Sequence, residues 1–402
     1  MISSQILVLN AGSSSLKYSL IDLNHDQQRY SGLIDRIGET SSTHTQQVNG
    51  TSLKTELTIA DHRQAIDLLF YNLNQQANFR PEMLACVAHR VVHGGERFQA
   101  PTQITPYVIN AIRDLIPLAP LHNPANLLGI ELSLAQLPNI PHIAVFDTAF
   151  HQSLPDYAYR YAVPESWYQQ HAVRRYGFHG SSHAYIAQQA AGYLNKPIEQ
   201  CRFISLHLGN GASACAIANG CSVDTSMGMT PMEGLVMGTR SGDMDPSIIF
   251  YLQRALNWSS QEIENQLNKH SGLKGLCHEN DMRMIHQRAE AGDQQAQLAR
   301  TLFAYRVKKY IGAYMAVLGD VDALLFTGGI GENDRWLRQN CLDGLSRFGI
   351  ALDKQLNQSC NQPITMISSA PPSIPILVIR TDEEFQIAKE SYHTLLLSSE
   401  KP

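Results

Sequence analysis

Residues 205–246 read SLHLGNGASACAIANGCSVDTSMGMTPMEGLVMGTRSGDMDP, and this stretch decides the fold of the 402-residue chain. Its apolar start is typical of a strand that ends in a tight Gly-Asn-Gly turn, and residues 212–217 are expected to form the returning strand. A segment rich in glycine, methionine and threonine then leads to Arg240. Glycines allow backbone amides to approach an anion closely, and arginine offers a planar fork to phosphate or carboxylate oxygens. The stretch therefore predicts the phosphate-handling centre of a nucleotide enzyme.

The same plan occurs at the beginning of the chain. Residues 5–9 have the pattern of a buried strand, small polar residues form a turn at residues 10–15, and residues 16–22 alternate as a second strand that carries Lys17. A Walker loop would read GxxxxGK[ST] and lead into a helix, and this turn does neither. Its amides and hydroxyls could hold a phosphate, but an ordinary hairpin with a serine-rich turn has the same pattern.

Two similar hairpins roughly 200 residues apart indicate an internal duplication, which predicts two related α/β domains. Chance similarity stays open, because Gly/Asn hairpins are common. A third glycine turn, at residues 328–333, follows an expected strand at residues 323–327 and is expected to lead into a helix from Asp334. Its amides could meet the ribose or phosphate of a nucleotide, although the same turn also suits close strand–helix packing.

Charged side chains lie at the ends of two further expected strands. Arg90 is near the end of a strand at residues 85–92. A buried arginine needs a partner, which is either an internal carboxylate or a substrate anion. Asp147 follows a strand at residues 143–146, and carboxylates at such positions line ligand crevices in α/β sheets.

Two expected helix starts also carry candidate groups. His179 precedes a helix whose N-cap is expected at Ser181 or Ser182, so His179 could bond a phosphoryl oxygen or act as a cap partner. Glu383 and Glu384 open the C-terminal helical pattern, where they are either first-turn helix acids or, for one of them, a ligand of Mg²⁺.

The remaining pattern places the cores. Residues 24–60 are polar and predict edge strands and loops, and residues 61–73 predict an amphipathic helix. Residues 297–318 form the clearest helical pattern. Its expected core stripe is Leu298, Leu302, Tyr305, Ile311, Tyr314, Met315 and Leu318.

Composition excludes several classes of partner. A net charge of −5 with no long basic block argues against nucleic acid or an anionic membrane. A chain of 402 residues, 44% of them hydrophobic, supports two or more domains with their own cores. The seven cysteines form no CxxC pair, which favours free thiols in a reducing, cytoplasmic compartment. We expect no secretory signal, no membrane span and no histidine-ligated structural metal.

The collected motifs resemble those of the acetokinase family, the acetate kinases, along nearly the whole chain. The matching segments, in chain order, are LNAGSSSLKYSL, AHRVVHGGERF, LAPLHNP, VFDTAFHQ, RRYGFHGSSH, HLGNGAS, VDTSMGMTPMEGLVMGTRSGDMDP, FTGGIGEN and TDEE. The resemblance implies an α/β fold of two duplicated ribonuclease-H-like domains, as in actin-like ATPases, with a nucleotide cleft between them. It places the N-terminal domain at residues 1–147 plus 385–402 and the nucleotide-binding C-terminal domain at residues 148–384.

Members of this family interconvert ATP plus acetate and ADP plus acetyl phosphate by direct in-line transfer, with Mg²⁺ or alternatively Mn²⁺, and they are homodimers. Acetate kinase activity is what the resemblance implies for this chain. The nearest alternative is a propionate or butyrate kinase of the same family, in which a side chain smaller than Val92 would enlarge the methyl pocket. A non-catalytic actin-like module would not need a complete acid-binding set, and an NAD-dependent dehydrogenase needs a GxGxxG motif that residues 328–331 do not fit.

By position, the resemblance implies a role for each motif residue. The catalytic residues are Asp147, His179 and Arg240. The acid substrate is contacted by Lys17, Arg90, Val92, Leu121, His122, Phe178 and Pro231. The transferring phosphate lies near Ser13 and Ser15, and Mg²⁺ is held by Asn10 and Glu383. The nucleotide is contacted by His207, Leu208, Gly209, Asn210, Gly211, Asp281, Met282, Arg283, Gly329, Ile330, Gly331, Glu332 and Asn333.

Two segments depart from the family's pattern. Residues 272–283, GLKGLCHENDMR, are shorter than the usual GLLGxSGxSxDxR, which weakens the assignment of Asp281, Met282 and Arg283 and leaves the nucleotide preference open. The ending TDEE replaces the more usual TNEE beside the expected metal carboxylate.

Overall fold

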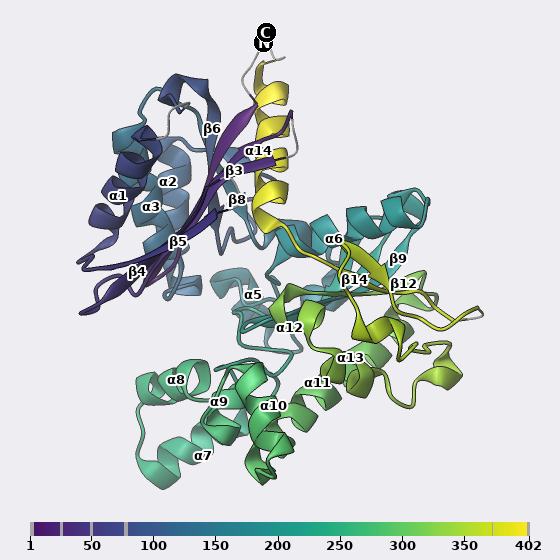
Figure 1. The fold of residues 1–402 in the computed structure, drawn as a ribbon. Coiled ribbons are helices and arrows are strands. Elements are labelled where there is room, and N and C mark those ends of the chain that lie inside the picture. The colour runs from purple at the N-terminus through teal and green to yellow at the C-terminus, as the bar shows by residue number, and fades with distance from the viewer. Residues whose placement is uncertain (1–3, 25–26, 49–50, 76–78, 372, 400–402) are drawn as a thin grey trace. The chain divides into compact units, whose positions relative to one another are not determined.

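The computed structural model describes residues 4–24, 27–48, 51–75, 79–371 and 373–399. The chain divides into two compact units. Unit 1 comprises Met1–Ala149 and Asp382–Pro402, and unit 2 comprises Phe150–Thr381. Each unit contains one mixed β-sheet with helices packed against it (Figure 1).

Unit 1 is built on an eight-stranded sheet in the order β5-β4-β3-β2-β1-β6-β8-β7. Neighbouring strands from β5 to β1 are antiparallel, β1, β6 and β8 are parallel, and β7 returns antiparallel to β8. The polar residues 24–60 supply β3, β4 and β5, which confirms the expected edge strands. The strands are β1 Gln5–Ala11, β2 Ser15–Asp22, β3 Gln27–Asp35, β4 Ser42–Val48, β5 Thr51–Leu57, β6 Leu84–Val91, β7 Thr102–Gln103 and β8 His142–Phe146.

Alternation along β1 sends its side chains into two different cores. Leu7 and Leu9 pack with residues of α1 and α3, whereas Ile6 and Val8 pack with residues of α14. Figure 1 shows α1, α2 and α3 on one side of these strands and α14 on the other. The helices of unit 1 are α1 His62–Asn74, α2 Pro106–Asp114, α3 Asn123–Gln136 and α14 Glu383–Ser399, with 3-10 turns η1 Pro81–Met83 and η2 Ile116–Leu118.

Unit 2 is built on a six-stranded sheet in the order β11-β10-β9-β12-β14-β13. Strands β11, β10 and β9 are antiparallel, β9, β12 and β14 are parallel, and β13 is antiparallel to β14. The strands are β9 Arg202–Leu208, β10 Ala212–Ala218, β11 Cys221–Thr225, β12 Ala323–Thr327, β13 Ile364–Met366 and β14 Ile376–Ile379.

The two sheets repeat one topology. The order β3-β2-β1-β6-β8-β7 of unit 1 corresponds to β11-β10-β9-β12-β14-β13 of unit 2, with the same parallel and antiparallel pairings at every step. In unit 1, the hairpin predicted from the sequence joins β1 and β2 through residues 12–14. In unit 2, the second predicted hairpin joins the equivalent strands β9 and β10 through residues 209–211. This shared order confirms the predicted pair of duplicated α/β domains.

Helices α6 and α11 lie on the two sides of the unit 2 sheet (Figure 1). Ile186, Ala187 and Ala190 of α6 pack with Phe203 and Leu325 of the strands, and α11 packs against β9 and β10. The helices of unit 2 are α4 Asp156–Tyr159, α5 Glu165–His171, α6 Gly180–Tyr193, α7 Ser247–Leu256, α8 Ser260–Lys269, α9 Gly272–Cys277, α10 Met282–Glu290, α11 Gln294–Leu318, α12 Gly328–Asn333 and α13 Arg335–Leu342. Shorter 3-10 turns are η3 Ala149–Ser153, η4 Ile198–Gln200, η5 Ser346–Phe348 and η6 Leu356–Gln358.

The expected core stripe of α11 is wrong in its N-terminal half. Leu298 and Tyr305 are 57% and 58% exposed, and the helix instead buries Ala299, Phe303 and Val307. Both stripes have helical spacing, because α11 carries apolar residues on more than one face, so periodicity alone does not select between them. Among the described helices, none is long and apolar enough to cross a membrane.

A buried polar group lies in the antiparallel half of the unit 1 sheet. Tyr18 on β2 and His44 on β4 are both buried, with the Tyr18 hydroxyl 2.7 Å from His44 Nε2. The Gln46 amide nitrogen lies 3.1 Å from His44 Nδ1. Because this amide nitrogen is a donor, Nδ1 accepts and the neutral ring is satisfied. Burial disfavours the charged imidazole and lowers the pKa of His44 to about 4.

This histidine predicts an acid-sensitive contribution to stability. The unfolded chain takes up a proton on His44 below about pH 6.5, whereas the folded chain stays neutral until about pH 4, so the free energy of unfolding falls as the pH drops between these values. We expect His44→Gln to reduce this fall, as measured by urea unfolding at about pH 7.5 and about pH 5. The matched control is His393→Gln on the exposed face of α14. Equal pH dependence in wild type and His44→Gln would contradict the prediction.

Candidate functional site

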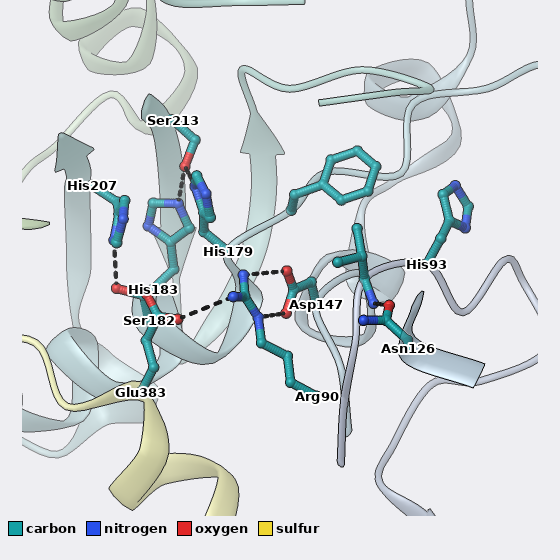
Figure 2. A network of polar contacts seen from close by, with 12 residues as sticks. Arg90, His93, Asn126, Asp147, His179, Ser182, His183, His207, Ser213 and Glu383 are labelled. Carbon is teal, nitrogen blue, oxygen red and sulfur yellow. Dashed lines mark hydrogen bonds and ion pairs between the residues drawn. The ribbon is translucent and has the colours of Figure 1, made fainter. Parts of the chain in front are cut away.

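In unit 1, Arg90 and Asp147 meet at the carboxyl ends of two neighbouring parallel strands, β6 and β8. Arg90 Nε donates to Asp147 Oδ1 at 2.8 Å and Nη2 donates to Oδ2 at 2.7 Å, a bidentate pair drawn in Figure 2. The Asp147 amide donates to the Val91 carbonyl at 2.9 Å, which fixes the aspartate beside the arginine. Of the two partners predicted for Arg90, an internal carboxylate is therefore present.

The charge of Arg90 is held by more than one carboxylate. Glu383 Oε2, at the start of α14, lies 4.0 Å from Arg90 Nη1. Burial opposes the charge of Arg90, but the carboxylates of Asp147, Glu383 and Glu384 outweigh it and raise the pKa of Arg90 above its ordinary value. The guanidinium is thus a permanent, oriented cation.

Two asparagines of α3 fix the backbone around this pair, and the sequence reasoning missed both. The buried Asn126, labelled in Figure 2, donates from Nδ2 to the Ala11 carbonyl at 2.7 Å and accepts from the Val92 amide at 3.0 Å. It therefore ties the first hairpin turn to the end of β6. Asn123 accepts from the His93 amide and donates to the His93 carbonyl. The sequence feature that could have identified both asparagines is that they are polar residues in an otherwise apolar helical pattern.

The serine turn of unit 1 is held by its own backbone and by α1. Gly12 N donates to the Ser15 carbonyl at 2.8 Å, and His62 Nε2 lies 2.7 Å from the Gly12 carbonyl. Ser13 is exposed, and Ser15 is partly buried. Lys17, predicted to contact the acid substrate, forms an ion pair with Glu384 at 2.5 Å. Of the other predicted acid-binding residues of unit 1, Val92 is partly buried, Leu121 is exposed and His122 occupies the N-cap position of α3.

Oxygen donors suited to Mg²⁺ also lie in unit 1. Asn10 is on β1, near the strand's carboxyl end, and Glu383 is the first residue of α14. Among the described residues, no group of three or more His, Cys, Asp or Glu could hold a metal ion. Mg²⁺ does not need such a group, because it is usually bound through one or two carboxylates with waters and phosphate oxygens. The amide and carboxylate oxygens present here fit that preference.

In unit 2, the predicted N-cap of α6 is wrong. The helix begins at Gly180, and the N-cap position is His179, which has φ 58° and makes no side-chain cap bond. Ser182 is not available as a cap, because its hydroxyl lies 2.8 Å from His207 Nδ1 and 3.0 Å from Thr381 Oγ1. A left-handed conformation is uncommon for a residue with a side chain and often marks a functional position.

His179 is held from two sides. Its Nδ1 lies 2.9 Å from Ser213 Oγ on β10, as Figure 2 shows. Its ring stacks on His207 with centroids 4.4 Å apart and an interplanar angle of 30°. The two predicted histidines, one catalytic and one nucleotide-binding, are therefore packed together.

The Gly209–Gly211 turn brings His179 and Arg240 to one place. A methyl group placed on Gly211 would lie 3.4 Å from His179 Nε2 and 3.9 Å from Arg240 Nη1. The two predicted catalytic donors of unit 2 therefore flank the same glycine. Asn210 is held beside them, because its carbonyl accepts from Gly238 N at 2.9 Å and its Oδ1 accepts from Asn280 Nδ2 at 3.3 Å.

Arg240 differs from Arg90 in having no acidic partner. Its Nη1 donates to the Pro231 carbonyl at 3.0 Å, and no carboxylate pairs with it in the part of the chain that the structure describes. Burial lowers the pKa of Arg240 below its ordinary value, as expected for a cation whose charge is not compensated. An arginine is still charged under these conditions, so this group is suited to an incoming anion.

The loop that carries Arg240 is fixed by residues outside the predicted site. Arg175 donates through Nη1 to the carbonyls of residues 225–227 and through Nη2 to Glu233 at 2.5 Å. Asp243 accepts from Gly234 N at 2.8 Å and from the Tyr310 hydroxyl at 2.8 Å.

The third glycine turn is itself helical, which corrects the expected turn at residues 328–333. It forms α12, and α13 follows with Asp334 as its N-cap. Gly328 has φ 79° and passes so close to β9 that a methyl group on it would lie 2.7 Å from the Leu208 carbonyl, so no larger residue fits. Glu332 Oε1 accepts from Gly328 N and Thr381 N.

A buried arginine that the sequence reasoning missed supports α12. Arg338 Nη1 donates to the carbonyls of Gly331 and Glu332 at 2.8 and 2.9 Å. Asn333 Nδ2 donates to the Gly329 carbonyl at 2.9 Å. The predicted nucleotide residues of α12, which also include Ile330, thus have a fixed backbone.

The segment that departs from the family's pattern begins α10. Asp281 caps this helix and forms an ion pair with Arg283, which is 87% exposed. The Met282 side chain is buried. Elsewhere in unit 2, His207 and Leu208 are buried at the end of β9, Phe178 is buried, and its carbonyl lies 2.9 Å from His151 Nε2.

Comparison with known proteins gives matches over nearly the whole chain. Residues 5–389 match the acetokinase family. The acetate kinase of Streptomyces coelicolor is 49% identical over 98% of this chain and 97% of its own length. A crystal structure of Porphyromonas gingivalis acetate kinase gives a TM-score of 0.91 at 40% identity, covering 98% of this chain and 100% of that one. A crystal structure of a propionate kinase from Francisella tularensis gives 0.91 at 42% identity, covering 96% of this chain and 98% of that one.

Asn126 yields a prediction on stability. Asn126→Ala leaves the partly buried Val92 amide and the buried Ala11 carbonyl without their partner, at a cost of about 1–3 kcal/mol for each group. We expect the free energy of unfolding to fall by about 2–4 kcal/mol in urea titrations. Asn110→Ala, on the exposed face of α2, is the control and should change it by less than about 0.5 kcal/mol. Similar losses in both variants would show that Asn126 does not bridge the two strands.

Proposed function

The chain belongs to the acetokinase family, and from this premise we propose that it reversibly transfers the terminal phosphoryl group of ATP to acetate, giving ADP and acetyl phosphate. The proposal is supported chiefly by the position of two side chains beside Gly211. One is Arg240, which lacks a carboxylate partner among the described residues, and the other is His179. A cation without a partner and an imidazole nitrogen at one glycine turn suit a phosphoryl group with developing negative charge.

The chemistry of the acid substrate explains why two arginines are needed. A carboxylic acid with an ordinary pKa near ~4.3 is ionised at neutral pH, so the nucleophile needs no general base. It needs help against the repulsion between two anions, and phosphoryl transfer depends chiefly on positioning and electrostatics. We propose that Arg90 binds the acetate carboxylate and that Arg240 stabilises the transferring phosphoryl group.

In this proposal Asp147 orients Arg90 rather than removing a proton. Its two oxygens accept from Nε and Nη2 of Arg90, so the acid is proposed to contact Nη1, which lies 4.0 Å from Glu383 Oε2. Unlike a general base, an aspartate in a bidentate pair keeps its charge and fixes the cation's plane. His179 donates to a phosphoryl oxygen.

The nucleotide is proposed to bind unit 2. The amides of the Gly209–Gly211 turn would contact its phosphates, and α12 with the start of α10 would contact the adenosine side. Since Met282 is buried, its proposed contribution is to packing beneath Asp281 and Arg283. Asn10 and Glu383 would hold Mg²⁺, which neutralises phosphate charge when bound.

We also propose that the chain forms a homodimer, as the family resemblance implies. The exposed apolar side chains of α7, which are Ile248, Phe250, Tyr251 and Leu256, support association.

A propionate kinase is the second candidate, and the Francisella tularensis structure favours keeping it. The two activities differ in the space for one methylene group. Val92, Leu121, Phe178 and Pro231 are the residues proposed to limit that space.

The proposal is tested by comparing acids in an ATP- and Mg²⁺-dependent assay that traps acyl phosphate with hydroxylamine. We expect kcat/KM to be about tenfold or more higher for acetate than for propionate, because one buried methylene discriminates by about 10- to 200-fold. A preference for propionate would support the second candidate instead. Absence of acyl phosphate with acetate, propionate and butyrate would refute the kinase proposal.

Arg240 yields the second functional prediction. Arg240→Ala should lower kcat by about 10³-fold, the scale of arginine stabilisation in phosphoryl transfer. The control is Arg347→Ala, an exposed arginine in η5. A loss smaller than about tenfold, with circular dichroism unchanged, would remove Arg240 from the catalytic residues.

A further inference from the structure

A continuous line of buried hydrogen-bonding groups leads away from His179. Ser213 Oγ on β10 lies 2.9 Å from His179 Nδ1 and 2.8 Å from His183 Nε2 on α6 (Figure 2). Ser205 Oγ on β9 lies 2.5 Å from His183 Nδ1. Ser205, Ser213 and His183 are all completely buried.

With neutral imidazoles, two proton arrangements make these contacts and also give the Ser213 hydroxyl hydrogen an acceptor. In the first, Ser205 donates to His183 Nδ1, His183 Nε2–H donates to Ser213, and Ser213 donates to His179 Nδ1, so the proton of His179 is on Nε2. In the second, every donor is reversed, and the proton of His179 is on Nδ1. A hydroxyl has one hydrogen, so Ser213 cannot donate to both rings. If Ser213 instead accepted from both rings, its own buried hydrogen would have no acceptor among the described residues, which is costly.

Ser205 decides between the two arrangements. In the described chain, Ser205 Oγ has no hydrogen-bond partner other than His183 Nδ1. In the second arrangement its hydroxyl hydrogen would be buried without an acceptor, and an unmade buried hydrogen bond is costly. The first arrangement uses every hydrogen.

We propose that Ser213, supported by His183 and Ser205, is a positioning residue that holds His179 as the Nε2–H tautomer. His179 Nε2 is the atom that faces Gly211 and Arg240, so this tautomer directs a neutral donor to the same place as the arginine. The role of that donor in phosphoryl transfer rests on the proposed function, whereas the tautomer itself does not.

The surroundings of His183 support a neutral imidazole ring in the hydrogen-bonded line from Ser205 to His179. Burial, followed by the neighbouring His151 and His207, lowers the pKa of His183 well below its ordinary value. Among the described residues, no carboxylate is paired with His183, and its side-chain hydrogen-bond partners are Ser205 and Ser213.

The tautomer is tested in the wild-type protein by nitrogen NMR of ¹⁵N-histidine-labelled chains at about pH 8, where an imidazole of ordinary pKa is neutral. His179→Gln assigns the signals. We expect a pyridine-like Nδ1 and a pyrrole-like Nε2 for His179. Ser213→Ala should give averaged shifts, and so should Ser205→Ala, because it removes the group that selects the arrangement. A pyridine-like Nε2 in the wild type would overturn the proposal.

Kinetics test the consequence. We expect Ser213→Ala to lower kcat by about 10- to 100-fold with KM for acetate nearly unchanged, the range seen when an orienting partner is removed. Ser205→Ala should have a smaller effect in the same direction. Ser133→Ala, which removes a buried hydroxyl bonded to the Gly129 carbonyl in unit 1, is the matched control and should leave kcat unchanged.

The two proposals fail separately. A wild-type protein that forms no acyl phosphate defeats the proposed function, and the NMR signals of His179 still decide the tautomer. If the wild type is active, and Ser213→Ala has the same kcat and the same His179 signals as the wild type, only the proposed positioning role of Ser213 is contradicted.

Discussion

Arg240, a half-buried arginine with no carboxylate partner in the described part of the chain, is the constraint on which the rest of unit 2 depends. Removing a guanidinium from water costs free energy unless another group compensates its charge. Among the described residues, Arg240 contacts only the Pro231 carbonyl and the polarisable Met237 sulfur, whereas Arg90 in unit 1 has a bidentate aspartate partner. The contrast indicates that one arginine is oriented by the protein and the other is kept for a ligand.

Keeping such a cation in place requires a rigid support that does not neutralise it. The loop that holds Arg240 is fixed through backbone groups, by Arg175 at residues 225–227 and by Asp243 at Gly234. Gly272 runs directly against it, since a methyl group there would lie 2.6 Å from the Arg240 carbonyl. The acidic groups near this loop are used by Arg175, Tyr161 and Tyr310, so the loop is ordered without an acid at Arg240.

Local pattern predicted much of this arrangement, and non-local contacts account for what it missed. Strand alternation and glycine turns predicted both hairpins, and the apolar runs predicted that Arg90 and Asp147 lie at strand ends. That these two strands are neighbours was not predicted, because strand pairing is non-local. The α6 start was missed because Ser182 bonds His207 and Thr381, which are distant in sequence. Asn126 and Arg338 were missed for the same reason, since each bonds backbone groups from other segments.

The duplicated topology places different groups at equivalent strand ends of the two units. In each unit, two parallel strands follow the hairpin along the chain. The residues at their carboxyl ends are well placed to contact a ligand, because ligands favour this edge of an α/β sheet. In unit 1 these strand ends carry Arg90 and Asp147, which are ionic side chains. In unit 2 the equivalent strands β12 and β14 lead to Gly328 and Thr381, whose amides converge on Glu332. Side-chain charge suits a small acid, and a glycine-rich backbone suits a bulkier nucleotide, so the proposed division of substrates agrees with the residues at equivalent strand ends.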